Sequence, residues 1–275
     1  MSGFLQLMIG PFIACLILTG IHAYLGLHVI ERGVIFVDLS LAQLAALGTT
    51  VAFVLGFGLH STVSYLMALG FTFIGALVFS LTRFRRSRVP HEAIIGIVYA
   101  VSAAAVILIL SRASEGGEEL KNLLVGHVLF VEPAELMRMG VIYSLVGLVH
   151  WRVRRPLLLI SQDPQRAFDQ GVRVRLWDLV FYLTFGLVVT SSVEIAGVLL
   201  VFAFLVVPSV CAAWLAQSVG RRLAVGWMLG VLTSVVGIVV SYQADLPTGA
   251  TVVCAFGGCL LCCGLFSTSR RWAHG

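Results

Sequence analysis

The sequence predicts an all-α membrane protein, a polytopic bundle of about nine transmembrane helices (eight to ten). Hydrophobic residues make up 59% of its 275 residues and charged residues only 11%, whereas a soluble domain carries about a quarter charged residues. Nine stretches approach the ~20 apolar residues that a helix needs to cross a bilayer. Alternation at period two is absent, and backbone groups in lipid need internal partners, so these stretches are expected to be helices.

The apolar stretches recur along the whole chain. No long polar stretch could fold as a separate soluble domain, so we expect residues 1–275 to form a single transmembrane domain. The N-terminus has no basic n-region and no small-residue cleavage site, which favours a retained first span over a signal peptide. The predicted spans are 4–27, 34–58, 62–82, 92–110, 133–151, 177–193, 195–217, 222–242 and 249–266.

The basic residues predict the orientation. They are scattered between spans and do not cluster on one folded face, so we expect the lipid bilayer as partner and no nucleic acid. With nine spans, all but Arg112, Lys121 and Arg138 fall on one side. By the positive-inside rule this side is cytoplasmic, the N-terminus lies outside and the C-terminus inside.

No enzymatic motif is found. A phosphate-binding P-loop needs a lysine after glycine, and the only lysine is Lys121, between Leu120 and Asn122. The sequence also lacks a nucleophile elbow, a zinc-protease helix and a dinucleotide fingerprint. We therefore expect neither ATP hydrolysis by this chain nor another enzymatic activity.

The six cysteines all lie in apolar runs. Cys259 and Cys262 have a CxxC spacing, but zinc sites of that type need a second ligand pair and a polar setting. The prediction is that the cysteines are small apolar helix residues.

Two segments are neither a span nor a simple loop. In 161–171, Asp163 and Pro164 read as an N-cap and first helical residue, and Gly171 as the stop. A short cytoplasmic helix of about seven residues follows, serving as a docking surface or as an ordinary linker.

The apolar segment 120–131 is too short to span the membrane. It fits either a half-helix dipping into the membrane or an interfacial helix.

Several polar residues lie near the ends of spans. Asp38, about four residues into its predicted span, can either stabilise the helix N-terminus or line a pathway, and Ser40 and Gln43 follow it. Glu92 and Asp178 occupy the first turns of their predicted helices, where an anion is favoured. Other groups able to bind a borderline metal such as zinc are His22, His28, His127 and Glu194, but no two histidines have ligand spacing on one helix.

The pattern resembles the membrane permease subunits of metal-ion ABC importers, the family that handles zinc, manganese and iron. Phe36 to Gly48 resembles the family's F-G-D-x-L-A-H-x-x-L-x-G stretch, and Glu92 to Val98 its acid-x-x-x-G-I segment. Leu123 to Leu129 resembles L-x-x-G-x-x-L, 161–171 its cytoplasmic S-x-D-x-x-x-A-x-x-x-G helix, and Gly197 to Pro208 its hallmark V-G-x-L-L-x-x-A-L-L-x-x-P. The order and spacing of these segments together are specific, and they cover most of the chain.

The resemblance implies a permease homodimer in the bacterial cytoplasmic (inner) membrane. It also implies ATPase subunits inside, which alone would bind ATP, and an extracytoplasmic metal-binding protein outside. A divalent metal, zinc or manganese, would be cargo, and no permanently bound cofactor is expected. The segment 161–171 would be the coupling helix received by the ATPase, with Ser161, Asp163, Ala167 and Gly171 at the matching positions.

The resemblance further implies a translocation path at Asp38, Ser40, Gln43 and Glu92, with Asp38 and His127 as candidate metal ligands. This sequence departs from the family on the second span, where the family has Asp and His four residues apart. Gln43 stands where the His would be, and Asp38 lies five residues before it, so without a gap Leu39 falls at the acid position. An amide oxygen is a weaker zinc ligand than imidazole.

The alternative function is a stand-alone secondary transporter or channel for a cation. Such a protein is expected to have buried charge near mid-membrane, whereas charged residues are sparse in the middle of these predicted spans.

Overall fold

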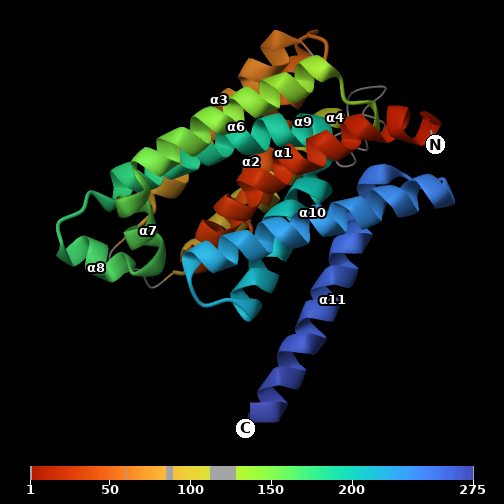
Figure 1. The fold of residues 1–275 in the computed structure, drawn as a ribbon. Coiled ribbons are helices and arrows are strands. Elements are labelled where there is room, and N and C mark those ends of the chain that lie inside the picture. The colour runs from red at the N-terminus through yellow and green to blue at the C-terminus, as the bar shows by residue number, and fades with distance from the viewer. Residues whose placement is uncertain (1, 60, 85–88, 112–127, 275) are drawn as a thin grey trace. The chain divides into compact units, whose positions relative to one another are not determined.

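The protein is described by a computed structural model, which covers residues 2–59, 61–84, 89–111 and 128–274, with side chains between residues 8 and 268 (Figure 1). In these ranges it has ten α-helices, one short 3₁₀ helix and no strand, so the all-α prediction is confirmed. Seven of the helices are long and apolar enough to cross a membrane. The elements are α1 (Ser2–Arg32), α2 (Val37–Val54), α3 (Thr62–Leu81), α4 (His91–Leu110), η1 (Val128–Phe130), α6 (Pro133–Arg152), α7 (Arg154–Gln162), α8 (Pro164–Asp169), α9 (Val174–Leu215), α10 (Val219–Ala244) and α11 (Thr248–His274).

Helix α9 contains two of the predicted spans. Its 42 residues would extend about 63 Å at 1.5 Å per residue, twice the thickness of a bilayer core. Gly197 interrupts it with a non-helical backbone, φ 75° and ψ 161°, a conformation that glycine adopts at little cost. The predicted division between 177–193 and 195–217 is thus confirmed as a break at Gly197.

Helix α6 forms over the predicted span 133–151 but is not among the seven helices that qualify as spans by composition. The reason is its polar content, which includes Glu135 and Arg138 near its start. Arg138 is not isolated: its Nη2 donates to Glu194 Oε2 at 2.8 Å. This ion pair neutralises both charges where α6 approaches α9, just before the break at Gly197.

Backbone contacts divide the chain into two compact units. The first comprises Met1–Ile30, Leu124–Tyr143 and Glu194–Gly275, and the second Glu31–Leu123 and Ser144–Val193. The expectation of a single domain over 1–275 therefore stays a prediction.

In the first unit, α1 packs closely on the second half of α9 and on α10. A Cβ added at Gly26 would overlap the Leu205 carbonyl oxygen, so only glycine allows this approach. The Trp227 indole on α10 donates to the Gly20 carbonyl at 3.0 Å. Helices α10 and α11 also pack together through Gly237, against which Val252 lies.

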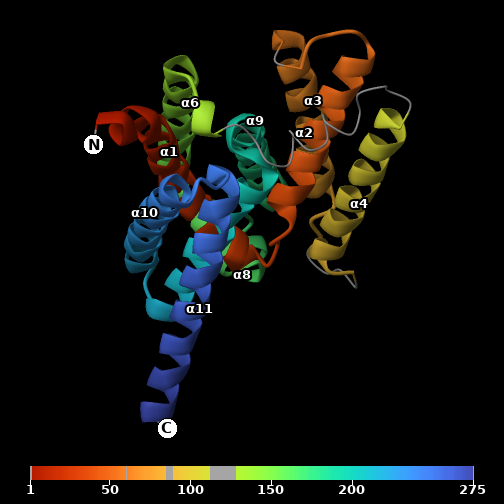
Figure 2. The same ribbon diagram turned by 90° about the vertical axis from the view of Figure 1, so that its right-hand side faces the viewer.

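In the second unit, α2 packs between α3 and α4 (Figure 2). Gly48 brings α2 so close to α3 that an added Cβ would lie 2.5 Å from the Met67 carbonyl oxygen. The hydroxyls of Thr72 and Thr190 lie 3.1 Å apart and join α3 to the first half of α9. Small residues and hydroxyl pairs are the contacts expected between helices in lipid, where apolar burial alone drives no association.

Candidate functional site

A buried arginine connects three separate segments of the second unit. Arg32, the last residue of α1, donates from Nε to Ser161 Oγ at 2.9 Å and from Nη1 to Asp178 Oδ1 at 2.5 Å. The Arg32 and Asp178 side chains are both 0% exposed. The guanidinium also lies over the Phe181 ring, 4.1 Å from its centroid, which adds a cation–π contact.

Asp178 has a second cationic neighbour. Arg83 Nε lies 3.6 Å from Asp178 Oδ2, and its side chain is 11% exposed. The expectation that Asp178 occupies the first turn of its helix is wrong, because α9 begins four residues earlier, at Val174. Asp178 is the counter-ion of Arg32 and Arg83. Because both arginines are far from Asp178 in the sequence, no local sequence pattern predicts this pairing.

The predicted cytoplasmic helix is present. Asp163 is the N-cap of α8, and its Oδ1 accepts a hydrogen bond from the Arg166 backbone N–H at 2.9 Å. Pro164 is the first helical residue, and Gly171 ends the motif with φ 71°. The prediction of a capped helix is confirmed, at six residues in length. Helix α7, directly before α8, was not predicted. It begins with two arginines, which are typical of a loop after a span, and its apolar run is short.

The α7–α8 segment (Arg154–Asp169) has a buried side and an exposed side. Ala167 on α8 is fully buried against Ile160 and Val174. Ser161 is also buried, and its hydroxyl receives the Arg32 hydrogen bond described above. Asp163 and Gly171 are exposed. Of the four predicted coupling residues, two thus hold the segment in place and two lie at its surface.

The N-terminus of α2 is built differently from the prediction. Helix α2 begins at Val37, so Asp38 lies in the first turn and not four residues inside a helix. The Phe36 backbone N–H donates to Glu92 Oε1 at 2.9 Å, and the Asp38 carboxylate lies beside the backbone N–H groups of Asp38 and Leu39 in its own first turn. Glu92 lies in the first turn of α4, as predicted, and it also caps α2 and brings its carboxylate to the turn that carries Asp38.

This turn presents oxygen atoms that find no hydrogen-bond donor within the described part of the chain: Asp38 Oδ1, Ser40 Oγ and Glu92 Oε2. Asp38 is 2% exposed and Ser40 0% exposed, so neither oxygen is solvated from outside. A buried polar group without a partner is costly. Carboxylate and hydroxyl oxygens are suitable ligands for hard cations such as Mn²⁺. Gln43, one turn further along α2, is also buried.

Of the other candidate metal ligands, His127 lies outside the described residues, and the rest have other surroundings. Glu194 is bound to Arg138, and the His22 ring nitrogen Nδ1 lies 2.9 Å from the Leu18 carbonyl in its own helix. His22 and His28 belong to the first unit, and both are buried. These contacts fit structural roles.

The comparisons with known proteins agree with the fold. The chain is 28% identical over 236 residues to "Manganese import system permease protein ScaB" of Streptococcus parasanguinis, covering 83% of this chain and 79% of that protein. It is 27% identical over 242 residues to "Manganese transport system membrane protein MntC" of Halalkalibacterium halodurans, covering 86% and 80%. The solved structure "PsaBC from Streptococcus pneumoniae in complex with Fab" contains a chain with TM-score 0.76 and 21% identity, covering 95% and 94%.

The strongest finding covers nearly the whole sequence. Residues 5–267 match the profile described as "ABC 3 transport family", and they include every described helix that carries the candidate site. Together with the seven membrane-capable helices, this match shows that the chain belongs to the ABC 3 transport family and is a multi-pass membrane permease.

Proposed function

We propose that this chain is the permease subunit of an ABC importer that moves a divalent metal ion, manganese or zinc, across the bacterial cytoplasmic membrane. The observation that carries the proposal is the buried first turn of α2. There Asp38 and Ser40, with Glu92 from α4, present oxygen atoms that no described donor satisfies. A partly dehydrated cation passing this turn would supply the missing partner.

The donor types favour manganese. Asp38, Ser40, Gln43 and Glu92 offer oxygen donors for a cation and neither imidazole nor thiolate, and hard oxygen ligands suit Mn²⁺ better than Zn²⁺. Relatives named for manganese transport support the same cargo. Asp38 is the proposed cargo-binding residue, and His127 is a second candidate from the segment outside the described residues.

Energy would come from separate subunits. No P-loop sequence is present in this chain, so ATP would be bound by partner ATPases, and no resident cofactor is needed for transport. The α7–α8 segment, with Asp163 and Gly171 on its surface, is the proposed ATPase contact. Through Ser161 it reaches Arg32, so displacement of this segment would pull on the end of α1.

The remaining parts of the assembly are proposed from the family to which the chain belongs. Two copies of the chain would enclose the path, each a single domain over 1–275. An extracytoplasmic metal-binding protein would deliver the metal. The N-terminus would lie outside and the C-terminus inside, as the distribution of basic residues favours.

Uptake in a reconstituted system tests the energy source. The permease, its ATPase and its binding protein are placed in proteoliposomes, and uptake of ⁵⁴Mn is followed with and without ATP inside. We expect uptake to require ATP and to stop when the ATPase carries a hydrolysis-dead substitution. Uptake that persists with the dead ATPase would identify a secondary transporter or channel instead.

Substitution of Asp38 tests the site. Asp38→Asn keeps the shape of the side chain and removes the charge that a cation needs. We expect uptake to fall while membrane abundance and melting temperature stay equal or rise, since a buried carboxylate oxygen without a donor is costly. Gly70→Ala, a substitution on α3 with nothing within 4 Å of the added Cβ, is the control. Normal uptake in Asp38→Asn would leave Asp38 as a helix-end residue only.

A further inference from the structure

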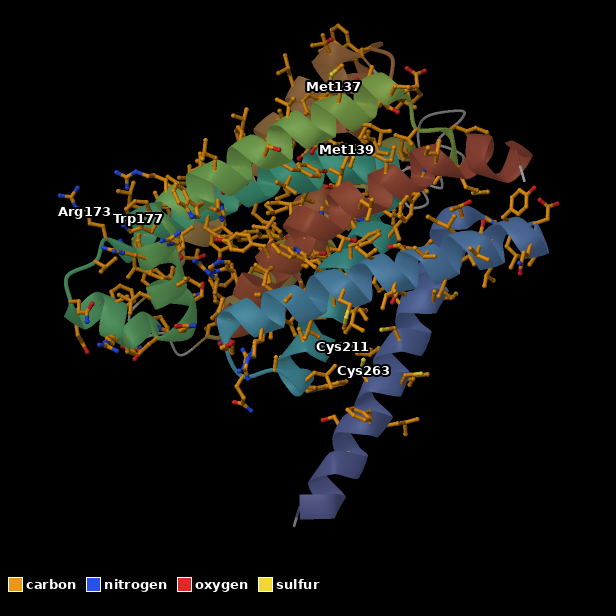
Figure 3. The ribbon with its side chains drawn as sticks, viewed as in Figure 1. Met137, Met139, Arg173, Trp177, Cys211 and Cys263 are labelled. Atoms are coloured by element: carbon orange, nitrogen blue, oxygen red, sulfur yellow. The ribbon has the colours of Figure 1, made fainter. Side chains whose placement is uncertain are left out.

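Three cysteines that the proposed transport path does not use lie together in the first unit. Cys211 lies on the second half of α9, and Cys259 and Cys263 lie one turn apart on α11. Their three sulfur atoms are all within 4.8 Å of one another. Figure 3 shows Cys211 and Cys263 side by side where the two helices meet. Within the described residues this is the only group of three or more His, Cys, Asp or Glu side chains close enough to share an ion.

The cluster is built into the helix packing. Cys211 is 0% exposed and Cys263 9%, and the Cys259 sulfur also neighbours the Thr233 hydroxyl of α10. The other two cysteines of α11, Cys254 and Cys262, are exposed and do not belong to the cluster. From α11 the cluster therefore contains Cys259 and Cys263, which are four residues apart and share a helix face. It does not contain the CxxC pair of Cys259 and Cys262.

We propose that Cys211, Cys259 and Cys263 form a binding site for a thiophilic d¹⁰ cation, such as Zn²⁺, Cd²⁺ or Cu⁺. Three sulfur ligands without an oxygen or imidazole ligand select soft metals. With metal–sulfur bonds of about 2.3 Å, a planar three-coordinate site places its sulfur atoms about 4.0 Å apart. None of the observed separations, all within 4.8 Å, exceeds this value by more than about 1 Å.

The binding step releases protons, because the thiolate and not the thiol is the metal ligand. A divalent ion forms bonds to three thiolates, so three S–H bonds are exchanged for three metal–sulfur bonds. Three protons leave, no electron is transferred, and the occupied site carries one net negative charge.

This site is chemically distinct from the proposed cargo path. The first turn of α2 offers only oxygen atoms and belongs to the second unit, whereas the cysteine cluster offers sulfur and belongs to the first. A metal held there would tie α9 to α11. The site therefore fits a bound, helix-fixing ion and not an ion in transit.

Cadmium binding to the purified full-length permease tests this assignment. The protein is fully reduced, handled without oxygen and titrated with Cd²⁺, while the ultraviolet thiolate-to-cadmium charge-transfer absorption and the cadmium bound per chain are measured. We expect one Cd²⁺ per chain and release of three protons. Cys259→Ala, which alters a partly exposed position, should weaken cadmium affinity at least about tenfold, the loss typical even of outer-shell partners. Cys211→Ser and Cys263→Ala should act in the same direction.

Matched controls come from the same helix. Cys254→Ala and Cys262→Ala should bind Cd²⁺ as the parent does, and Asp38→Asn should retain the charge-transfer absorption. Each variant is used only if its melting temperature without metal equals that of the parent. The proposal is overturned if Cys259→Ala binds Cd²⁺ with the affinity of the parent, or if Cys262→Ala loses as much affinity as Cys259→Ala does. It is also overturned if the reduced protein binds no Cd²⁺ and the air-oxidised protein shows only a disulfide within the cluster.

Discussion

Arg32 and Asp178 form a fully buried ion pair between the end of α1 and α9, with Nη1 and Oδ1 2.5 Å apart. The same guanidinium holds Ser161 of α7. A buried ion pair adds little net stability compared with an apolar pair, but loss of one partner leaves an uncompensated charge. In this protein it fixes three segments to one another beside the proposed ATPase contact.

Removal of Arg32 alone should be strongly destabilising. Arg32→Met should lower the free energy of unfolding by about 3–5 kcal/mol, because Asp178 stays buried with only the more distant Arg83 beside it. Arg32→Met combined with Asp178→Leu should recover most of this loss. Unfolding in sodium dodecyl sulfate, followed by circular dichroism, measures both values.

The control is Arg152→Met, which alters an exposed arginine at the end of α6 and should change stability little. A double variant that is no more stable than Arg32→Met would contradict the assignment of Asp178 as the charge left unpaired.

Glu92 combines two roles that substitutions can separate. Glu92→Ala removes the acceptor for the Phe36 N–H and should cost about 0.5–2 kcal/mol, the usual effect of losing a helix cap. Glu92→Gln keeps an oxygen acceptor, so its melting temperature should match the parent, yet manganese uptake should fall because the charge is gone. Thermal melting and ⁵⁴Mn uptake are measured on the same preparations. Full uptake by Glu92→Gln would show that Glu92 only caps α2 and that its charge is not needed for transport.

Gln43 is expected to influence which metal is carried. Gln43→His introduces an imidazole on the buried side of α2, at the position where the family resemblance places a histidine. Imidazole binds Zn²⁺ better than an amide oxygen does, so zinc uptake should rise relative to manganese uptake. Competition between ⁶⁵Zn and ⁵⁴Mn in the reconstituted system gives the ratio. Gln43→Asn keeps the amide and is the matched control; an equal zinc preference in both variants would argue against a role for Gln43 in selection.

Gly48 should be intolerant of a side chain. The Cβ of Gly48→Ala would meet the Met67 carbonyl oxygen at 2.5 Å, and α3 would have to move away from α2. We expect a loss of about 1–3 kcal/mol, as for other overpacked interiors. Gly70→Ala on α3 is the control, since nothing lies within 4 Å of its Cβ; it should gain up to about 1 kcal/mol from helix propensity. Equal melting temperatures for the two variants would show that the α2–α3 contact is not tight.

The sequence alone predicted the secondary structure well because lipid leaves the backbone few options. Apolar runs of sufficient length must be helices, and this argument identified α1 to α4, α6 and α9 to α11. The local chemistry of Asp163, Pro164 and Gly171 likewise predicted α8, since a cap, a first-turn proline and a left-handed glycine act within a few residues.

The contacts that give these helices their roles were decided by the tertiary structure. Asp178 and Glu92 each looked like a residue that stabilises its own helix, yet the first pairs with Arg32 and the second caps α2. The CxxC spacing drew attention to Cys262, whereas the fold groups Cys211 with Cys259 and Cys263. Sequence periodicity reports which face of a helix a residue occupies, but charge pairing and metal coordination depend on which other helix lies against that face.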